Sequence, residues 1–355
     1  MSPSRGLLRT THTFNALLSA PISTQIYLSA SQNPYLNLAL ENHLFTSQSA
    51  NIRTLLLYTN TPALILGRNQ NPWVETNHPV VLRTPDVSLL RRYSGGGAVF
   101  HDQGNVNYSV TVPTAEFSRD THAKLMVRVL RRLGVPLAAV NARHDIVVLP
   151  ESKGRKRLQE KVDSDVKGSR KVSGSAYKLT RFRSYHHGTM LLSTDLERVK
   201  GLLNSPARDV IVARGVASVP SPITNTGVEA SEFVATAVGE FAELYGNAGI
   251  AAVEEYEAME IEAVRKTMKK LKSEEWVYGQ TPKFTMRLPK GEVVADKGVV
   301  EEVNGVDGSG IVGARFGGEV VSALLARGGM EEEKARWWAD EMIGGRSWGT
   351  GTGID

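Results

Sequence analysis

Apolar positions along the chain alternate between a helical period and short continuous runs, and this pattern predicts a protein that contains both helices and strands. Leucines recur every four residues from Leu36 to Leu44, directly after an Asn-Pro pair that is typical of a helix start. Two apolar runs at 54–58 and 63–66 flank a Thr-Asn-Thr-Pro turn, so we predict that they form a β-hairpin.

The same reasoning places further elements along the whole chain. A first core segment is expected to begin near Thr24 with the residues TQIYLSAS. Short apolar runs predict strands at 89–93, 98–100, 105–112, 146–149, 171–177 and 189–192. Helical periodicity predicts helices at 121–133, 195–203, 230–245, 255–272, 317–327 and 331–342.

Length and composition predict two domains. At roughly 150 residues per domain, a chain of 355 residues is expected to form two. At Trp276 the sequence changes to short strands with much glycine, which places the boundary near 272–276. We therefore expect a large domain at 25–272 and a small carboxy-terminal domain at 273–355.

A charged segment interrupts the first of these domains. Residues 151–170 contain seven basic and four acidic side chains and little apolar surface. Such a composition cannot bury enough apolar area to order itself, so we predict a flexible insertion in a loop. A basic docking patch is the alternative that the same charges allow.

The amino-terminal residues have the composition of a targeting segment. The first acidic residue is Glu41, and the opening stretch MSPSRGLLRTTHTFNALLSA carries Arg5 and Arg9 among many Ser and Thr residues. Segments that contain Arg, are rich in Ser and lack acids are typical of mitochondrial transit peptides. We therefore expect residues 1–24 to direct the protein to mitochondria, with an ordinary disordered terminus as the alternative.

Charge and cysteine content exclude several classes of protein. The chain has 42 Lys and Arg against 37 Asp and Glu, and its net charge of +5 is too small to indicate a nucleic-acid partner without a localised patch. No apolar run reaches the roughly 18 residues of a membrane-spanning helix, so no membrane partner is expected. The absence of cysteine excludes disulfides, thiolate zinc sites and a cysteine nucleophile.

The segment 91–102, RRYSGGGAVFHD, is the first candidate site. Three consecutive glycines cost backbone entropy and contribute no packing, but they permit close approach of a ligand, and their N–H groups can line an anion site. Arg91 and Arg92 could supply positive charge for a phosphate or a carboxylate. A flexible hairpin loop with solvated arginines explains the same residues equally well.

A second candidate lies in 170–178, RKVSGSAYK, where small residues surround Lys171 and would let its long cation cross a tight space. Alone, this pattern also fits a surface lysine on an edge strand. The nearby His186 and His187 indicate a metal site less well, because adjacent residues of a strand point to opposite faces.

Together and in this order, the two segments resemble the lipoate–protein ligase A family. RRYSGGGAVFHDQGN is followed by RKVSGSAYK and HHGTMLLSTDL, and further family segments are matched by NPYLNLALENHLF, ALILGRNQNPWVETN and EEWVYGQTPKF. The similarity extends over residues 30–285. It implies an α/β catalytic domain with a mixed sheet, of the kind shared with biotin–protein ligases, and a small carboxy-terminal accessory domain.

The resemblance also implies an activity. Members of this family activate lipoate with ATP to lipoyl-AMP, accompanied by Mg²⁺, and then transfer the lipoyl group to a specific Lys of a lipoyl domain. The implied acceptors are the lipoyl domains of 2-oxoacid dehydrogenase E2 subunits and the glycine cleavage H protein. The lack of cysteine excludes the octanoyltransferases of this superfamily that hold the acyl group on a Cys.

By motif, the family's catalytic residues correspond to Arg92 and Lys171. The implied nucleotide-binding residues are these two together with Gly95, Gly96, Gly97, Ala98, Val99 and Phe100, and no metal ligand is assigned. We expect Lys171 to contact both nucleotide and lipoyl group and to stabilise developing charge, not to act as a nucleophile. Val99, Phe100 and Val172 are expected to contact the lipoyl chain.

The chain departs from the family pattern at two positions. Bacterial members usually carry Arg-Asn-Asp where this chain has Arg143-His144-Asp145, and Lys178 stands where Arg is common. Mitochondrial lipoyltransferases are more similar to this chain at the first position, and some of them move lipoyl groups between carrier proteins. A lipoyl amidotransferase is therefore the alternative activity, and a non-catalytic protein that binds lipoyl carriers is a third interpretation.

Overall fold

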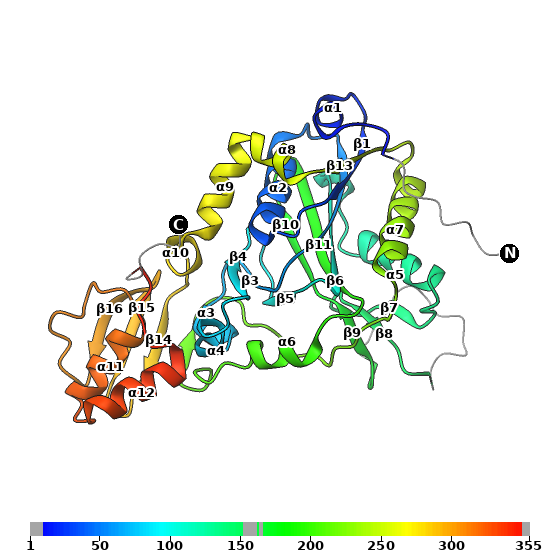
Figure 1. Cartoon of the computed structure of the whole chain (residues 1–355). Coiled ribbons are helices and arrows are strands. Elements are labelled where there is room, and N and C mark those ends of the chain that lie inside the picture. Colours follow the sequence, from blue (N-terminus) through cyan, green and yellow to red (C-terminus); the bar gives the residue numbers. More distant parts are fainter. Residues whose placement is uncertain (1–9, 152–161, 163–165, 350–355) are drawn as a thin grey trace. The chain divides into compact units, whose positions relative to one another are not determined.

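The computed structural model describes residues 10–151, 162 and 166–349 (Figure 1). Their contacts divide the chain into two compact units. Unit 1 contains the described residues of 1–61, 101–195 and 220–268. Unit 2 contains those of 62–100, 196–219 and 269–355. Each unit therefore combines segments that are far apart in the sequence, and the domain boundary expected at 272/273 stays a prediction.

Unit 1 combines a central sheet with helices. Its strands are β1 (Thr24–Ser29), β2 (Arg53–Thr59), β6 (Asn105–Pro113), β7 (Ala138–Val140), β8 (Ile146–Val148), β9 (Arg170–Ser173), β10 (Ser175–Leu179), β11 (Arg183–Leu191) and β13 (Gly249–Val253). Its helices are α1 (Phe14–Ser19), α2 (Pro34–Ser47), the 3₁₀ turn η1 (Thr114–Glu116), α5 (Thr121–Arg132), α7 (Ala230–Tyr245), α8 (Glu255–Glu260) and the first part of α9 (Glu262–Lys272).

A six-stranded sheet with the order β10-β11-β6-β2-β1-β13 forms the centre of unit 1. β1 pairs in parallel with β2 and β13, whereas β6 pairs antiparallel with β2 and β11. β7, β8 and β9 form a smaller antiparallel sheet. The mixed α/β architecture that the family resemblance implied is therefore confirmed.

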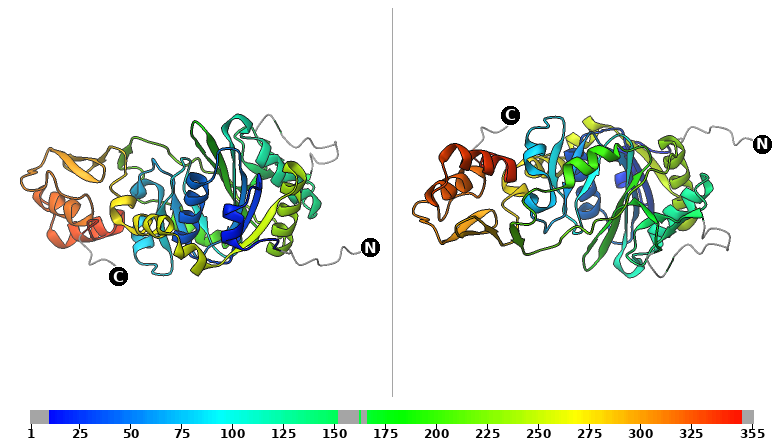
Figure 2. Two further views of the ribbon diagram at one scale, coloured as in Figure 1. Left: turned by 90° about the horizontal axis from the view of Figure 1, so that it is seen from above. Right: turned by 90° about the horizontal axis from the view of Figure 1, so that it is seen from below.

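Helices cover both faces of the central sheet, which explains why its inner strands are continuous apolar runs in the sequence. In β2, Leu55 and Leu57 face a core formed with α5 and α7, and these two helices contact one another (Figure 2). Leu56 and Tyr58 face a second core formed with α1, α2 and α8. Alternate residues of one strand thus serve two different cores.

The start of α2 follows from local rules. The side chain of Asn33 accepts hydrogen bonds from the N–H groups of Tyr35 and Leu36, at 3.1 and 3.4 Å. Pro34 occupies the first helical turn, where its missing N–H has no helical partner to lose. The predicted helix therefore begins where the Asn-Pro pair indicates.

The predicted hairpin of 54–58 and 63–66 is wrong. β2 belongs to the central sheet of unit 1, whereas β3 (Ala63–Leu66) belongs to a sheet of unit 2 with the order β4-β3-β5. Both edges of β2 are already paired, with β1 and β6, so no edge remains for β3. β3 pairs in parallel with β4 (Ser88–Arg91), and the two short helices between them supply the crossover that a parallel pair needs.

Two other expected elements are divided. The strand expected at 171–177 is two strands, β9 and β10, which lie in different sheets on either side of Gly174. The helix expected at 255–272 is broken at Ile261, whose backbone is extended. Among the helices of the described residues, none is long and apolar enough to cross a membrane.

Unit 2 contains two sheets and several short helices. Its further strands are β5 (Val99–His101, which ends in unit 1), β12 (Ile211–Ala213), β14 (Phe284–Arg287), β15 (Glu292–Asp296) and β16 (Val299–Asn304). Its helices are α3 (Pro72–Glu75), α4 (His78–Leu82), α6 (Leu196–Leu203), α10 (Glu274–Val277), α11 (Gly318–Arg327) and α12 (Glu332–Ile343). β12, β14, β15 and β16 form an antiparallel sheet whose core includes residues of α11 and α12.

Part of the expected transit segment is folded. Residues 14–19 form α1, and the side chains of Phe14 and Leu17 are fully buried against the sheet of unit 1. Residues 1–9 lie outside the described residues, as do 152–161 and 163–165 of the predicted insertion. The predictions of a targeting signal and of a flexible insertion therefore stay predictions.

Two buried histidines lie on one side of the central sheet. The ring of His186 packs 4.7 Å from that of Tyr177 and 6.0 Å from that of His122, and neither of its nitrogens has a hydrogen-bond partner among the described residues. His122 Nε2 lies 2.7 Å from the Tyr245 hydroxyl. Burial lowers the pKa of His122 to about 3 and lowers that of His186 well below its ordinary value.

Unit 1 is therefore expected to lose stability in acid. Below about pH 6.5 the unfolded chain binds protons at these imidazoles, whereas the folded chain does not. Each histidine should therefore lower the free energy of unfolding by about 1.4 kcal/mol for each unit by which the pH falls. The stability that these neutral histidines contribute is fully present above the pKa of histidine in the unfolded chain, and it is lost as the pH falls below that value. His186→Phe should reduce this slope by about 1.4 kcal/mol per pH unit in urea titrations below about pH 6. An unchanged slope would contradict the conclusion that burial lowers the pKa of His186.

Candidate functional site

The glycine-rich segment forms a loop between β4 and β5 in unit 2, and the buried guanidinium of Arg92 fixes its shape. Arg92 Nη2 donates to the carbonyl oxygens of Gly95 and Gly97, at 2.5 and 2.8 Å. Nη1 donates to the carbonyl of Ile65 at 3.0 Å, and Nε donates to the hydroxyl of Ser94 at 2.9 Å. Most donors of this side chain thus bond oxygens of the loop and of the neighbouring strand β3.

Glycine is needed at two positions of the loop. The φ of Gly96 is +83°, a conformation that side chains disfavour. A Cβ on Gly97 would lie 2.9 Å from Ser218 Oγ, which accepts the N–H of Ala98 at 2.9 Å. The loop is therefore packed and hydrogen-bonded, which removes the solvated hairpin as an explanation of its glycines.

Arg91 is fully buried and joins separate segments of unit 2. Its guanidinium donates to the carbonyls of Gly67, Arg68 and Gln70 at 3.2, 3.2 and 2.7 Å, to the carbonyl of Val277 at 2.8 and 2.5 Å, and to Thr281 Oγ1 at 3.2 Å. Burial lowers its pKa to about 9, so it remains a cation at neutral pH. The expectation that both arginines offer charge to a ligand is therefore wrong for Arg91, because the protein encloses its whole guanidinium.

Trp276 connects this buried arginine to two further cations. Its indole N–H donates to the carbonyl of Arg91 at 2.8 Å. The ammonium of Lys270 and the guanidinium of Arg68 lie 4.2 and 4.5 Å from the indole centroid, within the range of cation–π attraction. The backbone N–H of Arg68 donates to the carbonyl of Ser94 at 2.8 Å, so the backbone of Arg68 adjoins the glycine loop. No sequence spacing connects residues 68 and 270, so the sequence alone identifies neither of them as part of this cluster.

Two of the apolar residues expected at the lipoyl chain fill protein cores. Phe100 packs with Leu64 and Val81 in a small cluster of unit 2. Val172 is fully buried in the main core of unit 1. Val99 is only partly buried. Of the three, Val99 alone keeps exposed surface with which it could contact a ligand.

Lys171 lies on β9 in unit 1, and a carboxylate fixes its ammonium. Nζ lies 2.8 Å from Asp145 Oδ1, and the two side chains are 23% and 13% exposed. The backbone N–H of Lys171 donates to the carbonyl of Pro222 at 2.8 Å, and its carbonyl accepts the N–H of Thr224 at 3.0 Å. β9 is therefore paired on one side with β8 and on the other with residues 222–224, so Lys171 does not lie on an open strand edge.

A tight turn over 141–145 presents Asp145 to this lysine. The side-chain oxygen of Asn141 accepts the N–H groups of Arg143 and Asp145, both at 3.0 Å. The N–H of Asn141 donates in turn to the carbonyl of Asp145 at 2.9 Å. Asp145 was not among the predicted site residues, although the Arg-His-Asp sequence before the strand at 146–149 contained the signal.

The glycine after β9 and the strand β11 support the same region. Gly174 and Thr189 exchange two hydrogen bonds of 3.0 Å, one of them to the threonine hydroxyl. His187 Nδ1 lies 2.8 Å from Glu41 Oε2, and both side chains are buried. His186 faces the other side of the sheet, as strand alternation predicted. Within the described ranges, no three His, Asp or Glu side chains form a metal-ligand group.

The predicted site residues thus fall into two groups. Arg92, Gly95, Gly96, Gly97, Ala98, Val99 and Phe100 belong to unit 2, whereas Lys171 belongs to unit 1. Hydrogen bonds of Arg92 and Ser218 connect the residues of the first group. In the second group, Lys171 is paired with Asp145.

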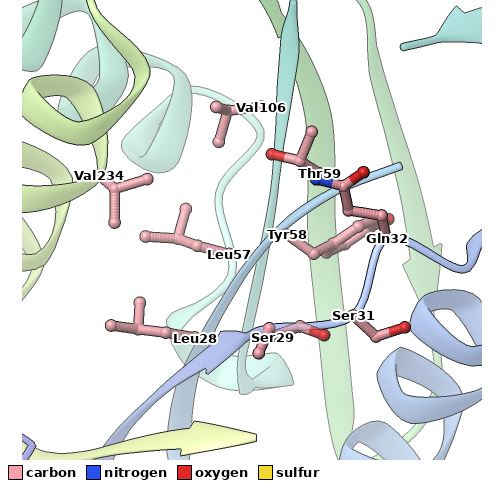
Figure 3. A pocket seen from close by; sticks show the side chains of 10 residues that line it. Leu28, Ser29, Ser31, Gln32, Leu57, Tyr58, Thr59, Val106 and Val234 are labelled. Carbon is pink, nitrogen blue, oxygen red and sulfur yellow. The ribbon is translucent and has the colours of Figure 1, made fainter. Parts of the chain in front are cut away.

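A cavity of about 200 Å³ opens in unit 1 at the carboxyl ends of β1 and β2 (Figure 3). Leu28, Leu57, Val106 and Val234 form its aliphatic wall, and Ser29, Ser31, Gln32, Tyr58 and Thr59 supply polar atoms. The lining contains no charged side chain and none of the predicted site residues. This cavity could accept a short apolar chain, but it holds no group for acyl transfer.

Arg91→Lys should destabilise unit 2 without removing a charge. A lysine has three donors and cannot replace the planar guanidinium that serves the carbonyls of 67, 68, 70 and 277, so we expect a loss of about 3 kcal/mol in the free energy of unfolding. Denaturant titration measures it. The exposed Arg287→Lys is the matched control and should change stability by less than about 0.5 kcal/mol. Equal effects of the two substitutions would show that Arg91 does not hold the unit together.

Comparison with known proteins identifies the family of the chain. Residues 33–241 match the family described as "Lipoyl protein ligase A/B catalytic domain". A Schizosaccharomyces pombe protein assigned as a lipoate–protein ligase A is 39% identical over 303 residues, which cover 79% of this chain and 78% of that protein.

Two solved structures have a similar fold. One is a bipartite lipoate–protein ligase described with its E2 lipoyl domain from Thermoplasma acidophilum, with a TM-score of 0.56 and 21% identity over 72% of this chain and 96% of that one. The other is a lipoate–protein ligase A bound with ATP, with a TM-score of 0.54 and 22% identity over 72% of this chain and 98% of that one. The chain therefore belongs to the lipoyl protein ligase A/B family and is a lipoate–protein ligase.

Proposed function

We propose that the chain activates lipoate with ATP to lipoyl-AMP and transfers the lipoyl group to a lysine of a lipoyl domain. The observation that carries this proposal is the ammonium of Lys171, which Asp145 holds at 2.8 Å on a strand paired at both edges. A cation held in place before the substrate binds needs no reorganisation when charge develops. The ATP bound by one structural relative and the E2 lipoyl domain of another are consistent with these substrates.

In the first step, a carboxylate oxygen of lipoate attacks the α-phosphorus of ATP, and the bond to pyrophosphate breaks. Negative charge grows on the non-bridging oxygens of the α-phosphate in the transition state. Lys171 is assigned the stabilisation of this charge, because an ammonium in a partly desolvated position interacts more strongly than one in water.

In the second step, the neutral amine of the carrier's lysine attacks the carbonyl carbon of the mixed anhydride. An amide bond forms, the bond to AMP breaks, and the amine proton passes to solvent water. We assign to Lys171 an interaction with the carbonyl oxygen and with the departing phosphate. Its positive charge would offset the negative charge of the intermediate and of the leaving group. It acts by its charge in both steps and forms no covalent bond.

We assign binding of the nucleotide to the glycine loop. Its N–H groups at 95–97 supply donors for phosphate oxygens without obstructing side chains. Arg92 bonds the carbonyls of Gly95 and Gly97, so a direct contact with phosphate requires it to exchange some of these bonds. Its first role is therefore to shape the loop, and its second is to add charge at the nucleotide.

We also propose that Mg²⁺ accompanies ATP. This ion takes most of its ligands from substrate phosphates and water, with one or two carboxylates from the protein, and it would neutralise the pyrophosphate. Asp145 is the carboxylate that adjoins Lys171 and could contribute a ligand.

Lys171→Ala should lower pyrophosphate release from ATP and lipoate by at least about 100-fold, because it removes the charge that stabilises the transition state. The fold should survive, which a thermal melt measures. Arg170→Ala is the matched control, since Arg170 is an exposed cation on the same strand and should retain near-normal activity. Near-normal pyrophosphate release by the Lys171 variant would refute its assignment.

A lipoyl amidotransferase is the second candidate, and the sequence Arg143-His144-Asp145 favours it. His144 stands where bacterial ligases carry Asn, and its imidazole pairs with Asp120 at 2.6 Å. Because His144 adjoins the pair of Asp145 and Lys171, we expect this substitution to affect adenylation of lipoate more than transfer of the lipoyl group.

Incubation with lipoate, ATP, Mg²⁺ and an apo lipoyl domain separates the two activities. We expect the mass of the domain to increase by one lipoyl group without any lipoylated donor. Modification only when a lipoylated carrier replaces lipoate and ATP would identify the amidotransferase. No modification under either condition would leave the binding protein as the correct interpretation.

The acceptors and the location follow as further parts of the proposal. Lipoyl domains of 2-oxoacid dehydrogenase E2 subunits and the glycine cleavage H protein are the proposed acceptors. The acid-free, Arg-containing amino terminus supports a mitochondrial location. Because Phe14 and Leu17 are core residues, we expect a removed leader to end before them, and the amino terminus of protein isolated from mitochondria tests this.

A further inference from the structure

The turn that presents Asp145 to Lys171 contains a residue in an unusual conformation. The φ of His144 is +65°, in the left-handed region that most residues avoid and that Asn, Asp and His enter more readily. The N–H of His144 donates to the carbonyl of Asn141 at 3.0 Å, which closes the turn. This backbone shape brings the next residue, Asp145, to the ammonium of Lys171.

The side chain of His144 anchors this conformation to a helix. Its Nδ1 lies 2.6 Å from Asp120 Oδ1, and the two side chains are 26% and 21% exposed. Asp120 directly precedes α5, a helix whose residues Leu125, Val129 and Leu130 are buried in the main core. Within the described residues its carboxylate makes no capping bond to the helix. Asp120 is therefore oriented toward the turn.

A second contact holds the other side of the turn. Arg143 Nη2 donates to the hydroxyl of Ser221 at 2.9 Å and lies 3.7 Å from Asp145 Oδ2. Ser221 directly precedes Pro222, whose carbonyl accepts the N–H of Lys171. The turn is thus fixed at one side to the start of α5 and at the other to the segment that pairs with β9.

We propose that the hydrogen bond of His144 and Asp120 positions Asp145 and, through it, the ammonium of Lys171. His144 and Asp120 are positioning residues in this proposal, since neither touches the lysine. The proposal rests on the function assigned to Lys171 above. It also explains how a chain with His in place of Asn keeps this turn: His144 enters the left-handed region, and its ring adds an anchor to the start of α5.

The test uses the full chain and the variants Asp120→Asn, His144→Asn and the double variant. Asn tolerates the left-handed backbone, so these changes remove the contact of imidazole and carboxylate and keep the turn available. Glu301→Gln is the control, because it removes an exposed ion pair with Lys283 in unit 2. Steady-state ligation with lipoate, ATP and an apo lipoyl domain gives kcat and KM, and thermal melts report the fold.

Each single variant should lower kcat on the order of fivefold, with little change in the KM for ATP, because the substrate still binds while the cation is misplaced. The double variant should lose no more than either single variant, since the two residues act through one contact. The exchange Asp120→His with His144→Asp restores a hydrogen-bonded pair of imidazole and carboxylate and should recover most of the loss. The control should retain full activity.

A second readout does not depend on ligation. The acylation rate of Lys171 by an amine-reactive ester, followed by mass spectrometry, should rise in both single variants relative to that of Lys283. Unchanged kcat and unchanged labelling in both variants would overturn the positioning role, while the function assigned to Lys171 would stand. Changed labelling without changed kcat would instead show that the pair positions Lys171 but that ligation does not need this position. If Lys171→Ala ligates normally, the proposed function itself fails.

Discussion

The structure of unit 2 depends on one buried cation, the guanidinium of Arg91. It donates to carbonyls of residues 67, 68 and 70 and to that of Val277, so it holds two segments far apart in the sequence. A buried carbonyl that loses its donor costs free energy, so the guanidinium stabilises both segments. Because Arg91 ends β4, its position also fixes where the glycine loop begins. Arg92 then shapes that loop from the next position in the chain.

The two consecutive arginines thus stabilise different parts of unit 2. Arg91 joins the segments that support the loop, and Arg92 bonds the carbonyls of Gly95 and Gly97 within it. A planar guanidinium suits both tasks, because its N–H groups point in fixed directions and can serve several carbonyls together. The nucleotide site proposed for this loop would benefit from such a frame, since the loop does not need to be ordered when a ligand arrives.

Unit 1 orients its cation by a different means. Lys171 is flexible by itself, and Asp145 restricts its ammonium to one position. The turn that carries Asp145 is in turn attached to α5 through His144 and Asp120 and to residues 221–222 through Arg143. Support of this kind makes the position of a charge independent of substrate, which is the condition for electrostatic stabilisation of a transition state.

Local patterns accounted for the elements whose signals are local. The Asn-Pro start of α2 and the period of α7 needed no distant partner, because helices form hydrogen bonds within one segment. The hairpin of β2 and β3 failed, since a strand takes its partner from any segment with a free edge, and both edges of β2 were already taken. The motifs around Arg92 and Lys171 identified the family because their residue types and order are specific.

By itself, the sequence determined the family, the mixed α/β class and the candidate residues Arg92 and Lys171. Only the tertiary structure decided that Arg91 is enclosed, that Phe100 and Val172 are core residues, and that Asp145 holds Lys171. The physical reason is that residue type fixes what a side chain can do, whereas burial and partners fix what it does. A guanidinium in water and one among carbonyls have the same sequence signature, and only the folded chain distinguishes them.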